Sequence, residues 1–244
     1  MRTSFYFVLW IGLYAIFDVI NIPFLENNAF IAAFILVIII SNMVNKSMAA
    51  DIAADRRMSM LRLYDEVYTN AIEKYRRKLL YNLILFIFLS VYFVITFVWI
   101  IVMISGRNIF DNLFELFIFG ACSFYYVYRT AKIGNNYFSL RAMSSLSEFF
   151  PGIEDDPAYL QFCSERSVRT FPQIMQTEHT PGKAYRISNM VFAVISILIG
   201  VWFLKMTLPF IVTFSFQNFY SVIMALYGAL ALQAGVKDLM DLSR

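Results

Sequence analysis

Residues 74–104 read KYRRKLLYNLILFIFLSVYFVITFVWIIVMI, a basic start followed by a long apolar run. The apolar part exceeds the roughly 20 residues that a helix needs to cross a bilayer. The basic residues that introduce it are Lys74, Arg76, Arg77 and Lys78. Positive charge next to a span marks its cytoplasmic end. The stretch therefore predicts a membrane-spanning helix, oriented by a basic anchor at the membrane surface.

The same pattern recurs along the chain. Six apolar stretches form three close pairs: about 4–24 with 29–44, 79–105 with 113–128, and 188–206 with 210–236. Connectors within a pair are short, whereas connectors between pairs are long and carry most of the positive charge. All of the 20 Lys and Arg residues except Arg107 and Lys205 fall on one side of a membrane in this arrangement. The expected fold is an all-α integral membrane protein with about six transmembrane helices as three hairpins and helical cytosolic extensions.

The expected organisation alternates hairpins and cytosolic segments. The boundaries are 1–44 for hairpin 1, 45–78 for a cytosolic helical segment, 79–128 for hairpin 2, 129–187 for a cytosolic segment with short helices, 188–236 for hairpin 3 and 237–244 for a cytosolic tail. Both termini are expected in the cytoplasm, and the protein in the inner membrane of a cell.

The composition favours a bilayer over water. Hydrophobic residues make up 60% of the chain and charged residues 15%, whereas soluble domains average about 45–50% and about 25%. The net charge of +3 is small, and the basic residues follow the expected topology. We therefore expect the lipid bilayer as a partner, and no nucleic acid.

Few residues offer catalytic chemistry. The chain has one histidine and two cysteines, too few for a four-ligand zinc site, so we expect no metal and no cofactor. Phosphate-binding glycine motifs and a nucleophile elbow are absent from the sequence. His179 precedes Thr180-Pro181 and is expected in an exposed loop. No catalytic residue is predicted.

Polar residues near the outer ends of the expected spans suggest a polar path. The candidates are Asp18, Asn21, Glu115, Lys205, Gln217 and Asn218. Asp18 is the most informative, because a charged side chain inside a span costs about 2.5–3.5 kcal/mol and tends to face a partner or a wet cavity. The alternative is that Asp18 reaches interfacial water or forms one structural hydrogen bond.

Two further patterns predict helix–helix contacts. No glycine or proline occurs between Phe24 and Ser105, so long helices are expected there, with a break near 49–57. A stripe at spacings of three and four residues consists of Leu61, Tyr64, Tyr68, Ala71 and Tyr75. It suits intramolecular packing, self-association or docking of another protein. Small residues at Ala225, Gly228 and Ala229 predict close approach of a second helix.

The second long connector contains two predicted short helices. One covers 137–150, and the other begins at Asp156-Pro157, where aspartate suits the N-cap and proline the first helical position. The connector also holds Phe149, Phe150, Phe162 and Phe171, which are expected to pack on the membrane surface or on the first cytosolic helices.

These patterns favour a non-catalytic polytopic membrane protein. It would assemble with itself or with other subunits on the cytosolic side, as a pore or as the membrane anchor of a larger complex such as a bacterial secretion or defence system. A small secondary transporter is the alternative, although such transporters often show internal repeats and interrupted helices, whereas this sequence has no evident repeat and few interruptions. An intramembrane enzyme has the least support from the residues present.

Overall fold

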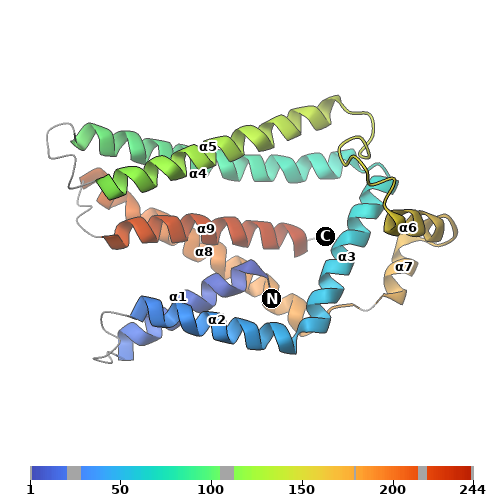
Figure 1. Cartoon of the computed structure of the whole chain (residues 1–244), viewed down its shortest axis with the longest axis horizontal. Helices are drawn as coiled ribbons and strands as arrows, with labels where there is room; N and C mark the ends of the chain where they lie inside the picture. The colour runs from blue at the N-terminus through green and yellow to red at the C-terminus, as the bar shows by residue number, and fades with distance from the viewer. Residues whose placement is uncertain (1, 21–28, 105–112, 179, 214–218, 243–244) are drawn as a thin grey trace. The chain divides into compact units, whose positions relative to one another are not determined.

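The computed structural model describes residues 2–20, 29–104, 113–178, 180–213 and 219–242, and within these ranges the chain is all α-helical, without a β-strand. The helices of this part are α1 (Thr3–Ile20), α2 (Ala29–Ser47), α3 (Ala49–Tyr68), α4 (Ile72–Ile104), α5 (Leu113–Ala142), α6 (Pro157–Val168), α7 (Phe171–Thr177), α8 (Lys183–Thr213) and α9 (Phe219–Leu242) (Figure 1). The all-α class expected from the sequence is confirmed.

Three helical segments are long and apolar enough to cross a membrane: Ile72–Val102, Lys183–Leu208 and Val222–Leu242. α2 and α3 qualify only when they are taken together, and they are bent by 77° at the break between them. The described residues thus support three spans, or four if the bent pair counts as one. The prediction of six spans is not supported.

Length and composition explain the difference. The apolar part of α1, Thr3–Phe17, would be roughly 22 Å long as a helix, which is shorter than a hydrocarbon core of roughly 30 Å. In α5 the apolar residues give way to Arg129, Lys132 and Arg141. Among the described residues, the apolar stretches of the sequence therefore outnumber the helices that are long and apolar enough to cross a bilayer.

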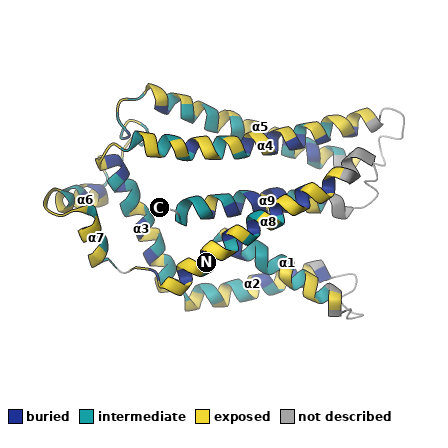
Figure 2. Cartoon of the chain, turned by 180° about the vertical axis from the view of Figure 1, so that it is seen from behind, coloured by how far each residue is buried: buried dark blue, intermediate teal, exposed yellow. Residues whose placement is uncertain are grey.

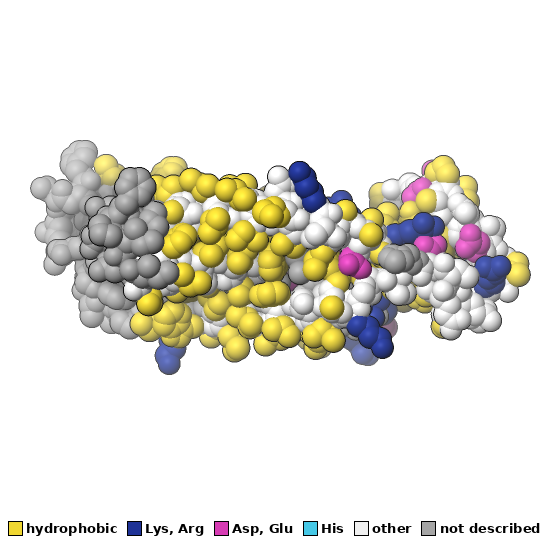
Figure 3. Space-filling view, turned by 90° about the horizontal axis from the view of Figure 1, so that it is seen from below, with side chains coloured by type: hydrophobic (Ala, Val, Ile, Leu, Met, Phe, Trp, Pro, Cys, Tyr) yellow, Lys and Arg dark blue, Asp and Glu magenta, His cyan; other side chains and the backbone are white. Residues whose placement is uncertain are grey.

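α4 is apolar on its exposed face as well as on its buried face. Large exposed apolar side chains recur every three or four residues, at Ile84, Phe88, Val91, Ile95 and Val98, and Figure 2 shows exposed positions along α4 and α8. Figure 3 shows many hydrophobic side chains at the surface of the face that it draws. A helix that is apolar all round is typical of a membrane protein.

The chain forms two compact units. The first contains residues 1–63, 164–199 and 231–244, and the second contains residues 64–163 and 200–230. Each unit has its own packing, which is described separately below.

The second unit is built around α4 and α5, which lie side by side (Figure 1). The rings of Phe93 and Tyr126 stack with centroids 5.0 Å apart, and the hydroxyls of Ser90 and Thr130 are hydrogen-bonded at 2.7 Å. At Gly134, an added Cβ would lie 3.7 Å from Leu83 Cδ1. Glycine is tolerated here inside a continuous helix, so the separate short helix predicted for 137–150 is wrong: α5 runs on to Ala142.

A second predicted interruption is also wrong. The expected spans 188–206 and 210–236 leave Thr207-Leu208-Pro209 as their connector, but α8 continues through it to Thr213. The Thr207 hydroxyl contacts the carbonyl oxygens of Phe203 and Leu204 at 3.1 and 2.9 Å, inside its own helix. Threonine can therefore satisfy its hydroxyl locally while the helix continues.

Candidate functional site

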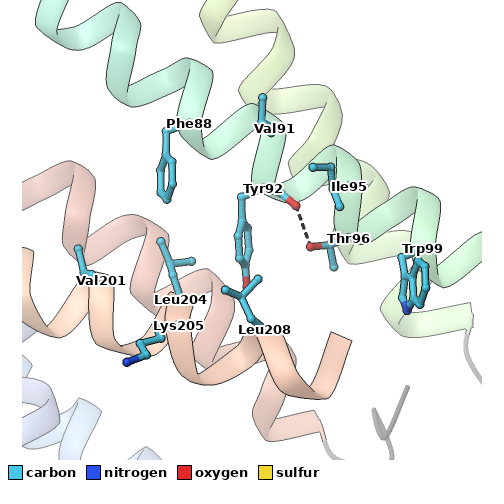
Figure 4. A pocket seen from close by; sticks show the side chains of 10 residues that line it. All are labelled: Phe88, Val91, Tyr92, Ile95, Thr96, Trp99, Val201, Leu204, Lys205 and Leu208. Atoms are coloured by element: carbon cyan, nitrogen blue, oxygen red, sulfur yellow. Dashed lines mark hydrogen bonds between the residues drawn. The ribbon is translucent and has the colours of Figure 1, made fainter. Parts of the chain in front are cut away.

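A groove between α4 and α8 is the first candidate site of the second unit. It has a volume of about 400 Å³. Its lining consists of Phe88, Val91, Tyr92, Ile95, Thr96 and Trp99 on α4, with Val201, Leu204, Lys205 and Leu208 on α8 (Figure 4). Almost all of these side chains are apolar. The groove therefore suits an acyl chain or an apolar helix rather than a polar solute.

Two hydroxyls that line the groove form hydrogen bonds within the protein. Tyr92 points from α4 toward α8 (Figure 4) and its hydroxyl is hydrogen-bonded to that of Thr207. The Thr96 hydroxyl donates to the Tyr92 carbonyl oxygen at 2.7 Å. Lys205 is exposed and has no ion pair within the described part of the chain. Its ammonium is the only charge that the described lining offers.

An aromatic cluster is the second feature of this unit. The cluster consists of Tyr64, Tyr68, Tyr75, Phe149, Phe150, Tyr159 and Phe162. Tyr64 lies 5.4 Å from Tyr159 and 5.9 Å from Phe162 between ring centroids. Tyr75, on the first turn of α4, contacts both Phe149 and Phe150. The cluster joins α3, α4 and the segment 143–163 into one packed module, which we call the aromatic module.

One carboxylate organises the start of α6 within this module. The Asp156 carboxylate accepts a hydrogen bond from the Ala158 amide at 3.0 Å and another from the Tyr64 hydroxyl at 2.7 Å. The helix begins at Pro157, as its capping residues predict. Burial raises the pKa of Tyr64 to about 12, and the hydrogen bond and charge of Asp156 act in the same direction. The hydroxyl therefore remains a donor at neutral pH.

The α3–α4 corner is held by one asparagine. Asn70 has a φ of 49°, a left-handed conformation that asparagine adopts more readily than most residues. Its side chain donates to the Ser144 carbonyl oxygen at 3.1 Å and accepts from the Leu146 amide at 2.7 Å. This corner divides the predicted stripe, so the expectation of one continuous helix through Ala71 is wrong. Leu61, Tyr64 and Tyr68 lie on α3, and Tyr75 on α4.

The first unit contains a polar network at the start of α1, which we call the Arg2 network. The Arg2 guanidinium lies 3.0 Å from Asp55 on α3 and 3.6 Å from Asp241 on α9. The Ser4 amide donates to the Asp238 carboxylate at 2.8 Å, and the Arg2 amide donates to the Asn189 side chain at 3.2 Å. Asp238 is 4% exposed. Acceptor side chains on α3, α8 and α9 thus bind the donor groups at the N-terminal end of α1.

The sequence did not reveal this network. Ser4 and Asp238 are separated by 234 positions, and Arg2 and Asp238 resembled ordinary polar ends of a membrane protein. The one available signal was the presence of acidic residues on the side expected to carry positive charge.

The predicted polar path falls largely outside the described part. Asn21, Gln217 and Asn218 lie outside the described residues, as does His179. Asp18 and Glu115 belong to α1 and α5, but their side chains are not described either. Lys205 lines the groove of the second unit. The path as a set remains a prediction.

The predicted basic anchor is partly engaged in ion pairs. Lys74 Nζ lies 3.1 Å from the Glu66 carboxylate, and Arg76 donates to Glu73 at 2.6 Å. The Lys78 ammonium lies 5.9 Å from the centroid of the Tyr75 ring. Three of the four basic side chains therefore have contacts within the second unit, and Arg77 is exposed.

The small residues of α9 lie against α8 in both units. An added Cβ at Gly228 would lie 3.0 Å from the Gly200 carbonyl oxygen, and one at Gly235 would lie 2.6 Å from that of Ala193. Ala225 and Ala229 are buried. The close approach predicted for this face occurs within the chain.

Metal chemistry has no candidate in the described residues, since no group of three or more His, Cys, Asp or Glu side chains is placed to hold an ion there.

The fold and its sites define an α-helical protein with helices suited to a membrane. No protein-family model matches the chain, and comparisons with curated proteins and with solved structures found no match.

Proposed function

We propose that the protein is a non-catalytic membrane component that anchors the aromatic module to a bilayer and assembles with further subunits through it. One observation carries this proposal. α4 runs without interruption from Tyr75, inside the module, to the exposed apolar residues of the candidate span Ile72–Val102. A single helix therefore connects the module to the membrane without a flexible linker.

The location of each part follows from charge. The segment around the module carries Glu148, Glu154, Asp155 and Asp156, which belong in water rather than lipid. The basic residues before the span support a cytoplasmic location for the module, because positive charge favours the cytoplasmic end of a span. We propose the inner membrane as the corresponding location.

The proposal is tested in membranes that contain the full chain. The protein should resist carbonate extraction, and in mild detergent it should migrate, by native mass spectrometry, as a complex larger than one copy. Phe162→Ala removes the centre of the aromatic module and should reduce the complex while leaving the chain in the membrane. Phe138→Ala, at an exposed position of α5 outside the module, is the matched control and should leave the complex intact.

Two results would overturn the proposal. One is a monomer as the only species extracted from native membranes. The other is a complex that survives Phe162→Ala and Tyr75→Ala together, because assembly would then not depend on the module.

A pore or small transporter is the second candidate, favoured by the Arg2 network. Buried carboxylates near a candidate span often belong to ion or proton pathways. Ion flux or substrate uptake in proteoliposomes that is lost in Asp238→Asn would favour this second function over an anchor.

A further inference from the structure

The first unit has a basic pocket at the end where α8 begins. The pocket has a volume of about 260 Å³ and is lined by Lys183, Arg186, Ile187 and Met190, with Leu242 from the end of α9. The four α8 residues are separated by three, four and seven positions, so they lie on one face of the helix. Charge and apolar surface therefore share a single opening.

Neither Lys183 nor Arg186 forms an ion pair within the described part of the chain. The neighbouring carboxylates have other partners: Asp51 accepts the Gly182 amide at 2.8 Å, and Asp55 and Asp241 contact Arg2. Both basic side chains therefore remain available to an anionic ligand.

Polarity changes along the pocket in the direction of the candidate span. Lys183 and Arg186 lie in the first turn of Lys183–Leu208, and Ile187 and Met190 follow toward its apolar interior. Ile187 is 63% exposed and Met190 is 55% exposed. A phospholipid has the same sequence of properties, with a charged phosphate at the interface and methylene groups below it.

We propose that this pocket binds the headgroup of an anionic phospholipid, an inference that rests on the membrane location proposed above. The phosphate lies between the Lys183 ammonium and the Arg186 guanidinium. Guanidinium can donate two parallel hydrogen bonds to phosphate oxygens, while ammonium contributes a compact charge. The first methylenes of an acyl chain pack on Ile187, Met190 and Leu242.

The test compares lipids on the purified full chain. Protein in a neutral detergent is titrated with phosphatidylglycerol or phosphatidylcholine, and bound lipid is counted by native mass spectrometry. Phosphatidylglycerol should bind more tightly. The double variant Lys183→Gln/Arg186→Gln should weaken it by roughly 30-fold, equivalent to about 2 kcal/mol, which is the contribution expected for two basic side chains at an anionic surface.

A charge-matched control separates this pocket from general attraction to an acidic membrane. Lys132→Gln/Arg141→Gln removes two exposed basic residues of α5 in the second unit and should leave phosphatidylglycerol binding unchanged. Met190→Ser tests the apolar wall and should weaken lipid binding without changing the net charge. Circular dichroism of each variant establishes that the helices remain folded.

Three results would overturn the inference: equal binding of the two lipids, an equal loss in the α5 control, or competition by inorganic phosphate alone at the concentration of the lipid. The last result would indicate a site for a free anion. Carbonate extraction tests the membrane location separately. A chain that remains in the membrane but shows no lipid preference contradicts only the headgroup site, whereas a chain that is extracted contradicts the proposed function as well.

Discussion

The Arg2 network and the aromatic module solve a similar problem with different interactions. Each connects segments that are distant in sequence near the end of a long apolar helix. The network of the first unit uses charged and hydrogen-bonded groups, such as Arg2 with Asp55 at 3.0 Å. The module of the second unit uses rings, with one carboxylate at its edge.

The difference concerns directionality and environment. Hydrogen bonds and ion pairs fix donors to particular acceptors, so the network specifies how α1 begins, but each buried polar group that loses its partner is costly. Ring packing depends on apolar area and shape and is not screened by salt. The first unit should therefore respond to ionic strength, and the second to changes of side-chain volume.

The largest effect is expected for Phe162→Ala. Phe162 is 3% exposed and contacts Tyr64 and Tyr68, and truncation of a buried phenylalanine costs about 3–5 kcal/mol. The free energy of unfolding of the detergent-solubilised protein, measured by chemical denaturation, should fall by this amount. Leu160→Ala, at a position that is 56% exposed, should have little effect. Equal losses in the two variants would mean that α6 does not pack on α3 through its buried face.

Asp238→Ala should be the next most destabilising change. It removes the acceptor of the buried Ser4 amide, and an unsatisfied buried donor costs about 1–3 kcal/mol. Asp238→Asn keeps an acceptor oxygen and should recover part of the stability, measured in the same denaturation experiment. Lys237→Ala, at the exposed neighbouring position, is the control. A fully stable Asp238→Ala variant would show that water replaces the carboxylate.

Tyr64→Phe should cost about 1.5 kcal/mol, the lower end of the range for a hydrogen bond to a charged acceptor. The ring remains, so the variant isolates the hydroxyl bonded to Asp156. Because burial raises the pKa of Tyr64 to about 12, this contribution is complete below the ordinary pKa of about 10 and is lost as the pH rises through about 12. Tyr81→Phe, at an exposed position, is the control and should leave the free energy of unfolding nearly unchanged.

The smallest effect is expected for Arg57→Gln. Arg57 pairs with Glu178 at 2.9 Å, but its side chain is 69% exposed, and exposed pairs contribute about 0–1 kcal/mol. Raising the salt concentration should reduce even this difference, whereas the effect of Phe162→Ala should persist. A salt-insensitive loss above about 1 kcal/mol would indicate a packing role for the arginine stem.

Local chemistry made some of these features predictable. The all-α class follows from long apolar stretches without glycine or proline, and the start of α6 follows from Asp156-Pro157 because capping depends on adjacent residues. The α3–α4 corner was missed because no glycine or proline marks it. Asn70 holds it through contacts with Ser144 and Leu146, which no local pattern contains.

Contacts between distant positions account for the other errors. The short helix expected for 137–150 is instead partly the end of α5, which runs through Gly134, where Leu83 of the neighbouring helix is close. The Arg2 network joins residues from α1, α3, α8 and α9. Neither arrangement follows from spacing along one helix, because each depends on which helices become neighbours after folding.

The length of α4 has a mechanical consequence. Its 33 residues extend roughly 50 Å at about 1.5 Å per residue, while the hydrocarbon core of a bilayer is roughly 30 Å thick. Once inserted, the helix would act as a stiff rod with the ring-packed segment around Tyr75 at one end. A tilt of α4 in the lipid would move that segment sideways, and a force on the segment would tilt the helix. Movement would therefore be transmitted in either direction without any change in secondary structure.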